Sequence, residues 1–94
     1  MFVRVVRFTG VSAERVQLVE DRVRANSGPP PGVNTKGLEV LFDEAQRTAV
    51  VLQRFATADD MREGARILEA MDPGETPGTR ASVDSCEMRI EVSA

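Results

Sequence analysis

The sequence predicts an α+β fold in which a four-stranded antiparallel sheet carries two helices on one face, in the order βαββαβ. Runs rich in β-branched and aromatic residues alternate with two stretches in which apolar residues recur at helical spacing. The second and third of these runs are separated by only about four polar residues, which favours a hairpin. The 94 residues are 41% hydrophobic and 29% charged, a composition typical of one small globular domain.

The first half of the chain contains a strand, a helix and a proline-rich loop. Residues 2–9 are mostly β-branched or aromatic, which predicts the first strand. Ser12 is a suitable N-cap, and the valines after it recur at helical spacing and predict a helix over 13–26. Three prolines and three glycines exclude regular structure over 28–37. Two interpretations of this loop stay open, a surface connector and a loop over a binding site.

The second half begins with a hairpin and a second helix. Residues 38–43 and 47–55 are apolar runs joined by a polar turn, which predicts two antiparallel strands. Thr57 is suited to cap the next helix, because the carboxylate of Asp60 follows it at the spacing of a capping box. Apolar positions then recur at helical spacing, and the Asp-Pro-Gly sequence at 72–74 ends the helix.

The last part of the chain is predicted to form a long strand. After a second Gly/Pro loop, residues 80–92 alternate between a largely apolar and a polar face. Cys86 falls on the apolar face with Ile90, so we expect a buried and unreactive cysteine. At about 3.3 Å per residue, a strand of this length overhangs its own sheet. The elements together define a single ferredoxin-like domain spanning residues 1–94.

Apolar residues occur on both faces of the first strand, although helices cover only one face in this fold. Val3 and Val5 alternate with Val6 and Phe8, and the third strand shows the same two-sided pattern. A second copy of the chain would cover the face without helices and hide the exposed strand edges. We therefore expect a homodimer. Which face of the third strand points toward the helices stays open.

Composition and charge argue against several functional classes. Twelve basic and 15 acidic residues give a formal net charge of −3, so we expect neither a nucleic-acid nor a membrane partner. The chain has no histidine, so imidazole metal ligation and histidine base catalysis are excluded. Its single cysteine forms no internal disulfide, and its glycines make no phosphate-binding motif. We expect a cytoplasmic protein that uses no metal and no cofactor.

Three stretches resemble the dimeric α/β-barrel superfamily, near its antibiotic biosynthesis monooxygenase-like domains. One is the first strand with its turn and long helix, and another is the strand at 37–43 after the loop. The third is 50–61, where a strand leads into an aromatic residue, a threonine cap, an acidic pair and an apolar residue. The resemblance implies a dimeric barrel that binds or turns over a small apolar or aromatic metabolite.

The chain departs from the oxidative members of this superfamily. Those members rely on an asparagine in the first strand, a tryptophan at the end of the third strand, and often a histidine or tyrosine. Here Phe55 stands in the tryptophan position, the first strand has no asparagine, and the chain has neither histidine nor tyrosine. Haem degradation is therefore not expected, and whether the chain is an enzyme stays open.

We expect polar residues on the face without helices to line a ligand pocket between the sheets of two copies. With the aromatic residue that ends the third strand, the candidate ligand-binding residues are Glu39, Arg54, Phe55, Glu87 and Arg89, and Gln53 stays open as the alternative to Arg54. Enclosed charges need partners, so we expect the carboxylates to pair with the arginines, and an arginine to anchor an anion or carbonyl. The sequence identifies no catalytic residue. Two functions remain, a small-molecule-binding or enzymatic barrel and a non-catalytic dimerisation or ligand-sensing module.

Overall fold

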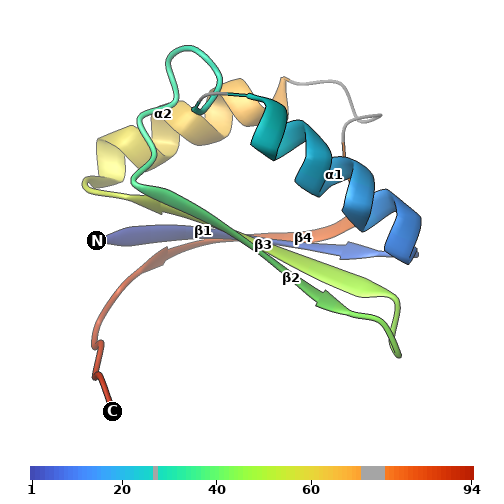
Figure 1. The fold of residues 1–94 in the computed structure, drawn as a ribbon. Helices are drawn as coiled ribbons and strands as arrows, with labels where there is room; N and C mark the ends of the chain where they lie inside the picture. Colours follow the sequence, from blue (N-terminus) through green and yellow to red (C-terminus); the bar gives the residue numbers. More distant parts are fainter. Residues whose placement is uncertain (27, 71–75) are drawn as a thin grey trace.

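A computed structural model of the chain describes residues 1–26, 28–70 and 76–94. Within them, the elements follow the order that the sequence predicts (Figure 1). They are β1 (Phe2–Thr9), α1 (Ala13–Ala25), β2 (Gly37–Asp43), β3 (Thr48–Phe55), α2 (Ala58–Glu69) and β4 (Thr79–Glu87). The predicted end of the second helix at 72–74 lies outside the described residues.

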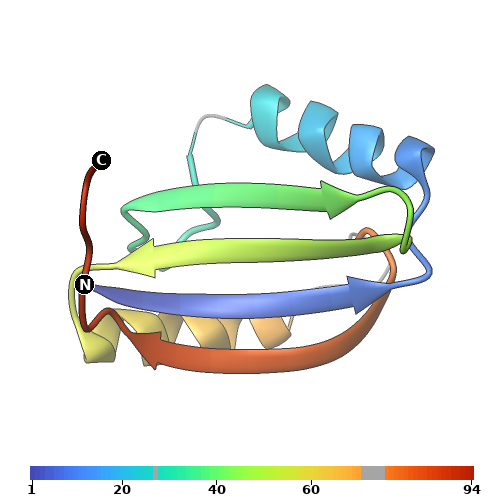
Figure 2. The same ribbon diagram turned by 90° about the horizontal axis from the view of Figure 1, so that it is seen from below.

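The strands form one antiparallel sheet in the order β2-β3-β1-β4, seen face-on in Figure 2. Both helices lie on the same side of this sheet, and no described helix covers the other side (Figure 1). The predicted ferredoxin-like α+β fold is thus confirmed. None of the described helices is long and apolar enough to cross a membrane.

Both predicted helix caps are present. The Ser12 hydroxyl oxygen accepts a hydrogen bond from the backbone N–H of Arg15 at 3.2 Å. The Thr57 hydroxyl oxygen accepts one from the backbone N–H of Asp60 at 3.0 Å. Each cap satisfies one of the first N–H groups of its helix, which have no partner inside the helix. The two caps fix where the chain turns from strand to helix, and so which way each helix crosses the sheet.

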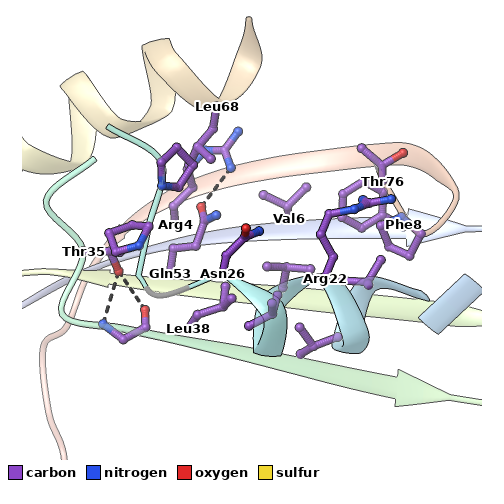
Figure 3. Close-up of a pocket in the computed structure, with 18 of the residues that line it drawn as sticks. Arg4, Val6, Phe8, Arg22, Asn26, Thr35, Leu38, Gln53, Leu68 and Thr76 are labelled. Atoms are coloured by element: carbon purple, nitrogen blue, oxygen red, sulfur yellow. Dashed lines mark hydrogen bonds between the residues drawn. The ribbon is translucent and has the colours of Figure 1, made fainter. Parts of the chain in front are cut away.

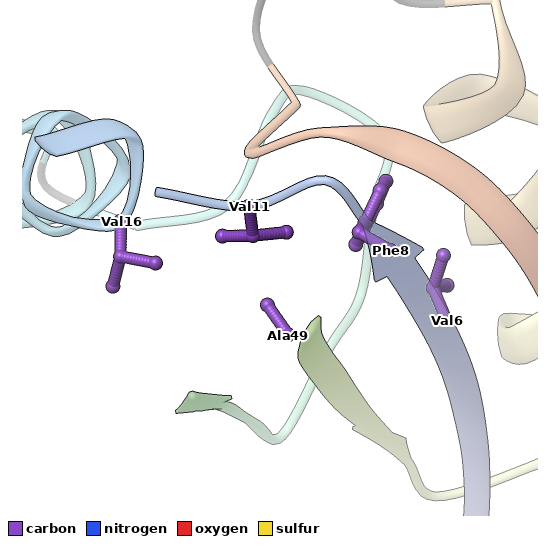
Figure 4. Close-up of a cluster of buried hydrophobic side chains, with 5 residues drawn as sticks. All are labelled: Val6, Phe8, Val11, Val16 and Ala49. Carbon is purple, nitrogen blue, oxygen red and sulfur yellow. The ribbon is translucent and has the colours of Figure 1, made fainter. Parts of the chain in front are cut away.

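Two clusters of buried apolar side chains hold the helices on the sheet. The first joins the start of α1 to β1 and β3 (Figure 4) and consists of Val6, Phe8, Val11, Val16 and Ala49. The second lies under α2 and consists of Val33, Phe55 and Met61, with Phe2, Ile67 and Leu68 packed against it. Val16 is the one buried residue of α1. The first helix is therefore anchored near its start and packs less closely along the rest of its length.

The last strand is shorter than the sequence predicts. It ends at Glu87 instead of continuing to residue 92, and residues 88–94 turn away from the sheet (Figure 1). Glu87 pairs with Phe2, the first residue of β1, and the Met88 N–H donates to the Met1 carbonyl oxygen at 2.9 Å. Beyond this point the chain has no neighbouring strand to pair with. Ile90 is left 79% exposed.

The two faces of the sheet differ in what covers them. We call the face without helices the open face, and its β1 and β3 residues are Val3, Val5, Arg7, Val50, Leu52 and Arg54, which pair across the two strands. Cys86 lies opposite Val3 on this face and is exposed. The expectation of a buried cysteine is wrong, because the described helices cover the other face and β4 is an edge strand.

Candidate functional site

A cavity of about 520 Å³ lies between the two helices and the sheet (Figure 3). We call it the central cavity. Its sheet side is formed by helix-facing residues of β1, β2 and β3, and its other walls come from α1, α2, the proline-rich loop and the segment before β4. Most of its sheet lining is aliphatic or aromatic: Val6, Phe8, Leu38, Val40 and Val51.

The cavity exists because α1 is not packed down along its whole length. Val16 is buried at the start of the helix, whereas Val19 is half-buried and Val23 is 44% exposed. Both later valines line the cavity, so the apolar stripe of the helix faces this space instead of side chains from the sheet. The apolar side of α1 thus faces the apolar side of the sheet across the cavity.

The proline-rich loop forms one side of the cavity and is tied to the sheet at its end. The Lys36 N–H donates to the Arg54 carbonyl oxygen at 2.6 Å, and the Thr35 hydroxyl donates to the same oxygen at 3.0 Å. Pro29 and Pro30 also line the cavity. The structure thus places this loop beside the central cavity, and the interpretation of the loop as one over a binding site stays a prediction.

One charged side chain is buried in the floor of the cavity. Arg4 is only 4% exposed, and its Nη1 donates to Gln53 Oε1 at 3.0 Å (Figure 3). Its Nη2 lies 3.9 Å from Glu69 Oε1, a long ion pair to a half-exposed carboxylate. Its Nε is buried and has no hydrogen-bond partner within the described part of the chain. The guanidinium is therefore only partly satisfied.

The electrostatics around Arg4 follow from this burial. Loss of water around the guanidinium lowers the pKa of Arg4, the Glu69 carboxylate raises it, and the charge of Arg80 lowers it. An arginine nevertheless keeps its charge at neutral pH because its ordinary pKa is so high. The site thus holds a fixed positive charge in a place that water reaches poorly.

The charged side chains that the structure describes in the cavity wall share one sign. Its cationic residues are Arg4, Arg22, Lys36 and Arg80, and the described lining residues include no carboxylate. The whole chain carries a formal net charge of −3, so this grouping runs against the composition. Such a concave, cation-lined site favours a negatively charged group.

The residues predicted for the ligand pocket lie elsewhere. Glu39 and Arg54 do pair, with Glu39 Oε1 3.4 Å from Arg54 Nε, but on the open face and half-exposed. Glu87 and Arg89 form an exposed pair at 3.8 Å near the end of β4. Phe55 is fully buried under α2 and shares no face with Arg54. Within one copy of the chain these five residues do not meet at one site, and none of them lines the central cavity. The pocket predicted between the sheets of two copies stays a prediction.

Sequence reasoning missed Arg4 and considered Gln53 only as an alternative to Arg54, although a signal was present. In β1 the residues at even positions are Phe2, Arg4, Val6 and Phe8, so one charge interrupts an otherwise apolar face. Gln53 interrupts the matching face of β3, and the register places it opposite Arg4. Two polar residues that face each other inside a buried layer indicate a functional or structural pair.

The fold and the cavity define a small ferredoxin-like α+β domain with an apolar, cation-lined space between its helices and its sheet. Neither a scan against protein-family models nor a search of the curated proteins finds a match to the chain. Among the residues that the structure describes, no group of three or more histidine, cysteine or acidic side chains is arranged to hold a metal ion.

Proposed function

We propose that this chain binds a small, largely apolar molecule in the central cavity. One observation carries the proposal: an apolar space of about 520 Å³ whose floor holds one buried, partly satisfied arginine. Ligand sites in proteins are typically concave, mostly apolar and roughly 300–1,000 Å³, with a few fixed polar groups. An apolar metabolite is also what the resemblance to monooxygenase-like barrel domains implies, and membership of that superfamily is part of the proposal.

The side chains at the cavity favour binding over acid–base catalysis. Its polar lining consists of arginine, lysine, asparagine, glutamine and threonine. None of these side chains ordinarily exchanges a proton near neutral pH, and the chain contains no histidine. Binding and sensing a metabolite is therefore the primary function that we propose, with turnover as the alternative.

We further propose that the chain acts as a homodimer joined through the open face. Val5 and Leu52 lie side by side at its centre, and Leu41 at its β2 edge is 52% exposed. Ile90 and Val92 in the segment after β4 are about four-fifths exposed, at 79% and 80%. A second copy, related by a two-fold axis, presents the same open face, so that the apolar residues of the two open faces pack together. The unpaired edge of its β4 lies available to the segment after β4 of the first copy.

A neutral fluorescent dye tests the cavity. Nile red is apolar and uncharged, so its binding reports on the apolar walls of the cavity. We expect one dye molecule per chain, and at least about tenfold weaker binding in Val19→Phe, whose ring fills the space that the dye needs. Leu18→Phe is the matched control, since Leu18 directly precedes Val19 on α1, is 54% exposed and does not line the cavity.

Two results would contradict the binding proposal. One is the absence of saturable dye binding to the folded wild-type chain. The other is binding that Val19→Phe leaves unchanged but that Leu52→Ser abolishes, because the dye would then occupy the open face. Turnover is tested separately. The mass of the small molecule that is bound to the purified protein is measured before and after incubation in air, and a changed mass indicates turnover.

A further inference from the structure

We propose that the molecule held in the central cavity is an organic carboxylate, with its carboxylate on Arg4 and its apolar body among the valines. This inference rests on the proposed function and adds the chemical class of the ligand. It follows from three independent features of the cavity: the unsatisfied edge of Arg4, the sign of the surrounding charges and the apolar character of the remaining walls.

The hydrogen bonds of Arg4 leave one edge of its guanidinium in need of a partner. Nη1 is already engaged by Gln53 at 3.0 Å. Nε is buried without a partner in the described part of the chain, and Nη2 has only the 3.9 Å ion pair to Glu69. Nε and Nη2 form the edge that receives the two oxygens of a carboxylate in a bidentate pair. A planar carboxylate therefore matches the two donors, Nε and Nη2 of Arg4, for which the described part of the chain supplies no hydrogen-bond acceptor.

Leaving this edge empty is costly for the protein. Arg4 is 96% buried, by its exposed fraction of 4%, and a buried charge without full hydrogen bonding is destabilising. The Glu69 side chain does not remove the cost, because it is 51% exposed and too distant for a hydrogen bond. A ligand carboxylate would complete the pairing inside the cavity, where water screens the charge less.

The surrounding charges select the same ligand class. Lys36 and Arg80 add positive charge to the wall, and no described lining residue carries a carboxylate that would repel an anion. A neutral apolar molecule would gain nothing from these groups. A cationic molecule would be repelled by them.

The other walls of the cavity limit the chemical nature of the ligand body that carries the carboxylate. Val6, Val40 and Val51 form the floor beside Arg4, and Leu68 closes one side. These walls offer few hydrogen bonds, so a sugar or nucleotide body would lose its water without compensation. The fitting ligand has one acidic end and an aliphatic or aromatic body.

Decanoate and decanamide separate the carboxylate from the body, because they share a chain length and differ in charge. We expect calorimetry on the wild-type protein to show decanoate binding at least about tenfold more tightly than decanamide, as expected for a charged hydrogen-bonded pair. Arg4→Met should abolish this preference while Nile red and decanamide still bind. Arg7→Met is the matched control, since it removes the same charge from the same strand but on the open face.

A second variant acts in the opposite direction. Glu69→Gln removes the carboxylate that competes for Arg4 and should tighten decanoate binding several-fold with no effect on decanamide. Equal affinity of the wild-type protein for decanoate and decanamide, with Nile red still bound in the cavity, would overturn the carboxylate inference alone. A loss of decanoate preference in Arg7→Met as large as in Arg4→Met would also overturn it. Failure of all three molecules to bind would overturn the proposed function itself.

Discussion

Arg4 on β1 and Gln53 on β3 lie directly opposite each other in the register of the sheet, and Arg4 Nη1 donates to Gln53 Oε1 at 3.0 Å. Their neighbours on the same face are apolar, including Val6 beside Arg4 and Phe55 beyond Gln53. The pair therefore places a charge and an amide in a layer that otherwise forms the core. Such a pair gives little net stability, which agrees with the proposal that Arg4 serves to bind a ligand.

The first prediction concerns the stability of the empty protein. Replacing the pair in Arg4→Met/Gln53→Leu removes a partly satisfied buried charge and its amide together. We expect the free energy of unfolding to rise by about 1–3 kcal/mol, because well-packed apolar replacements of buried polar groups are often stabilising. Urea denaturation of the ligand-free proteins measures it. A loss of stability of similar size would show that the pair serves the fold itself.

The second prediction concerns the dimer. Leu52→Arg places a charge at the centre of the open face, two residues before Arg54 on the same face of β3 and opposite Val5 in the sheet. Sedimentation equilibrium should give twice the chain mass of 10.3 kDa for the wild type and the mass of a single chain for the variant. Leu18→Arg, a similar change on the exposed side of α1, should remain dimeric. A monomeric wild-type protein would contradict the proposed interface.

A third prediction tests how α2 packs on the sheet. A methyl group added at Gly64 would lie 2.8 Å from Cε1 of the Phe55 ring, closer than these atoms can approach. We expect Gly64→Ala to lower the free energy of unfolding by about 1 kcal/mol, since overpacking outweighs the better helix propensity of alanine. In the background of Phe55→Leu the same substitution should be neutral or stabilising. Additive effects in this double-mutant cycle would contradict the close contact.

The fourth prediction concerns the mobility of α1. Because Val16 is its one buried residue, the helix has fewer packing contacts toward its end than α2 has. Backbone amides around Val23 should exchange hydrogen faster than those around Met61, which is buried. A ligand in the cavity should slow exchange around Val23 and leave that around Met61 unchanged. Equal protection of the two helices in the free protein would contradict this account of how the cavity forms.

The order of elements was predictable because each depends on local signals. The β-branched and aromatic residues at 2–9 favour a strand, and Ser12 and Thr57 cap helices through their own hydroxyl groups. The length of β4 was not predictable in this way. An edge strand ends where its neighbouring strand ends. β4 ends at Glu87 because its antiparallel partner β1 begins at Phe2, and the sequence of β4 does not contain this information.

The position of the site could not be predicted for a related reason. Both faces of β1 carry apolar residues, so the pattern does not show which of them the helices cover. Placing the pocket on the open face led to Glu39 and Arg54, which pair with each other on that face and lie outside the central cavity. The buried position of Arg4 becomes evident only when Gln53 is seen opposite it. That relationship depends on the register, which joins residues far apart in the chain.

Methyl NMR of the valines, with Nile red or decanoate added, tests the central claim most directly. Val6 and Val51 face the cavity, whereas Val5 and Val50 are their neighbours in the same two strands and lie on the open face. The account predicts shifts of the Val6 and Val51 methyl signals that saturate at one ligand per chain, with Val5 and Val50 unchanged. Shifts confined to Val5 and Val50 would place the ligand on the open face and contradict a binding site between the helices and the sheet.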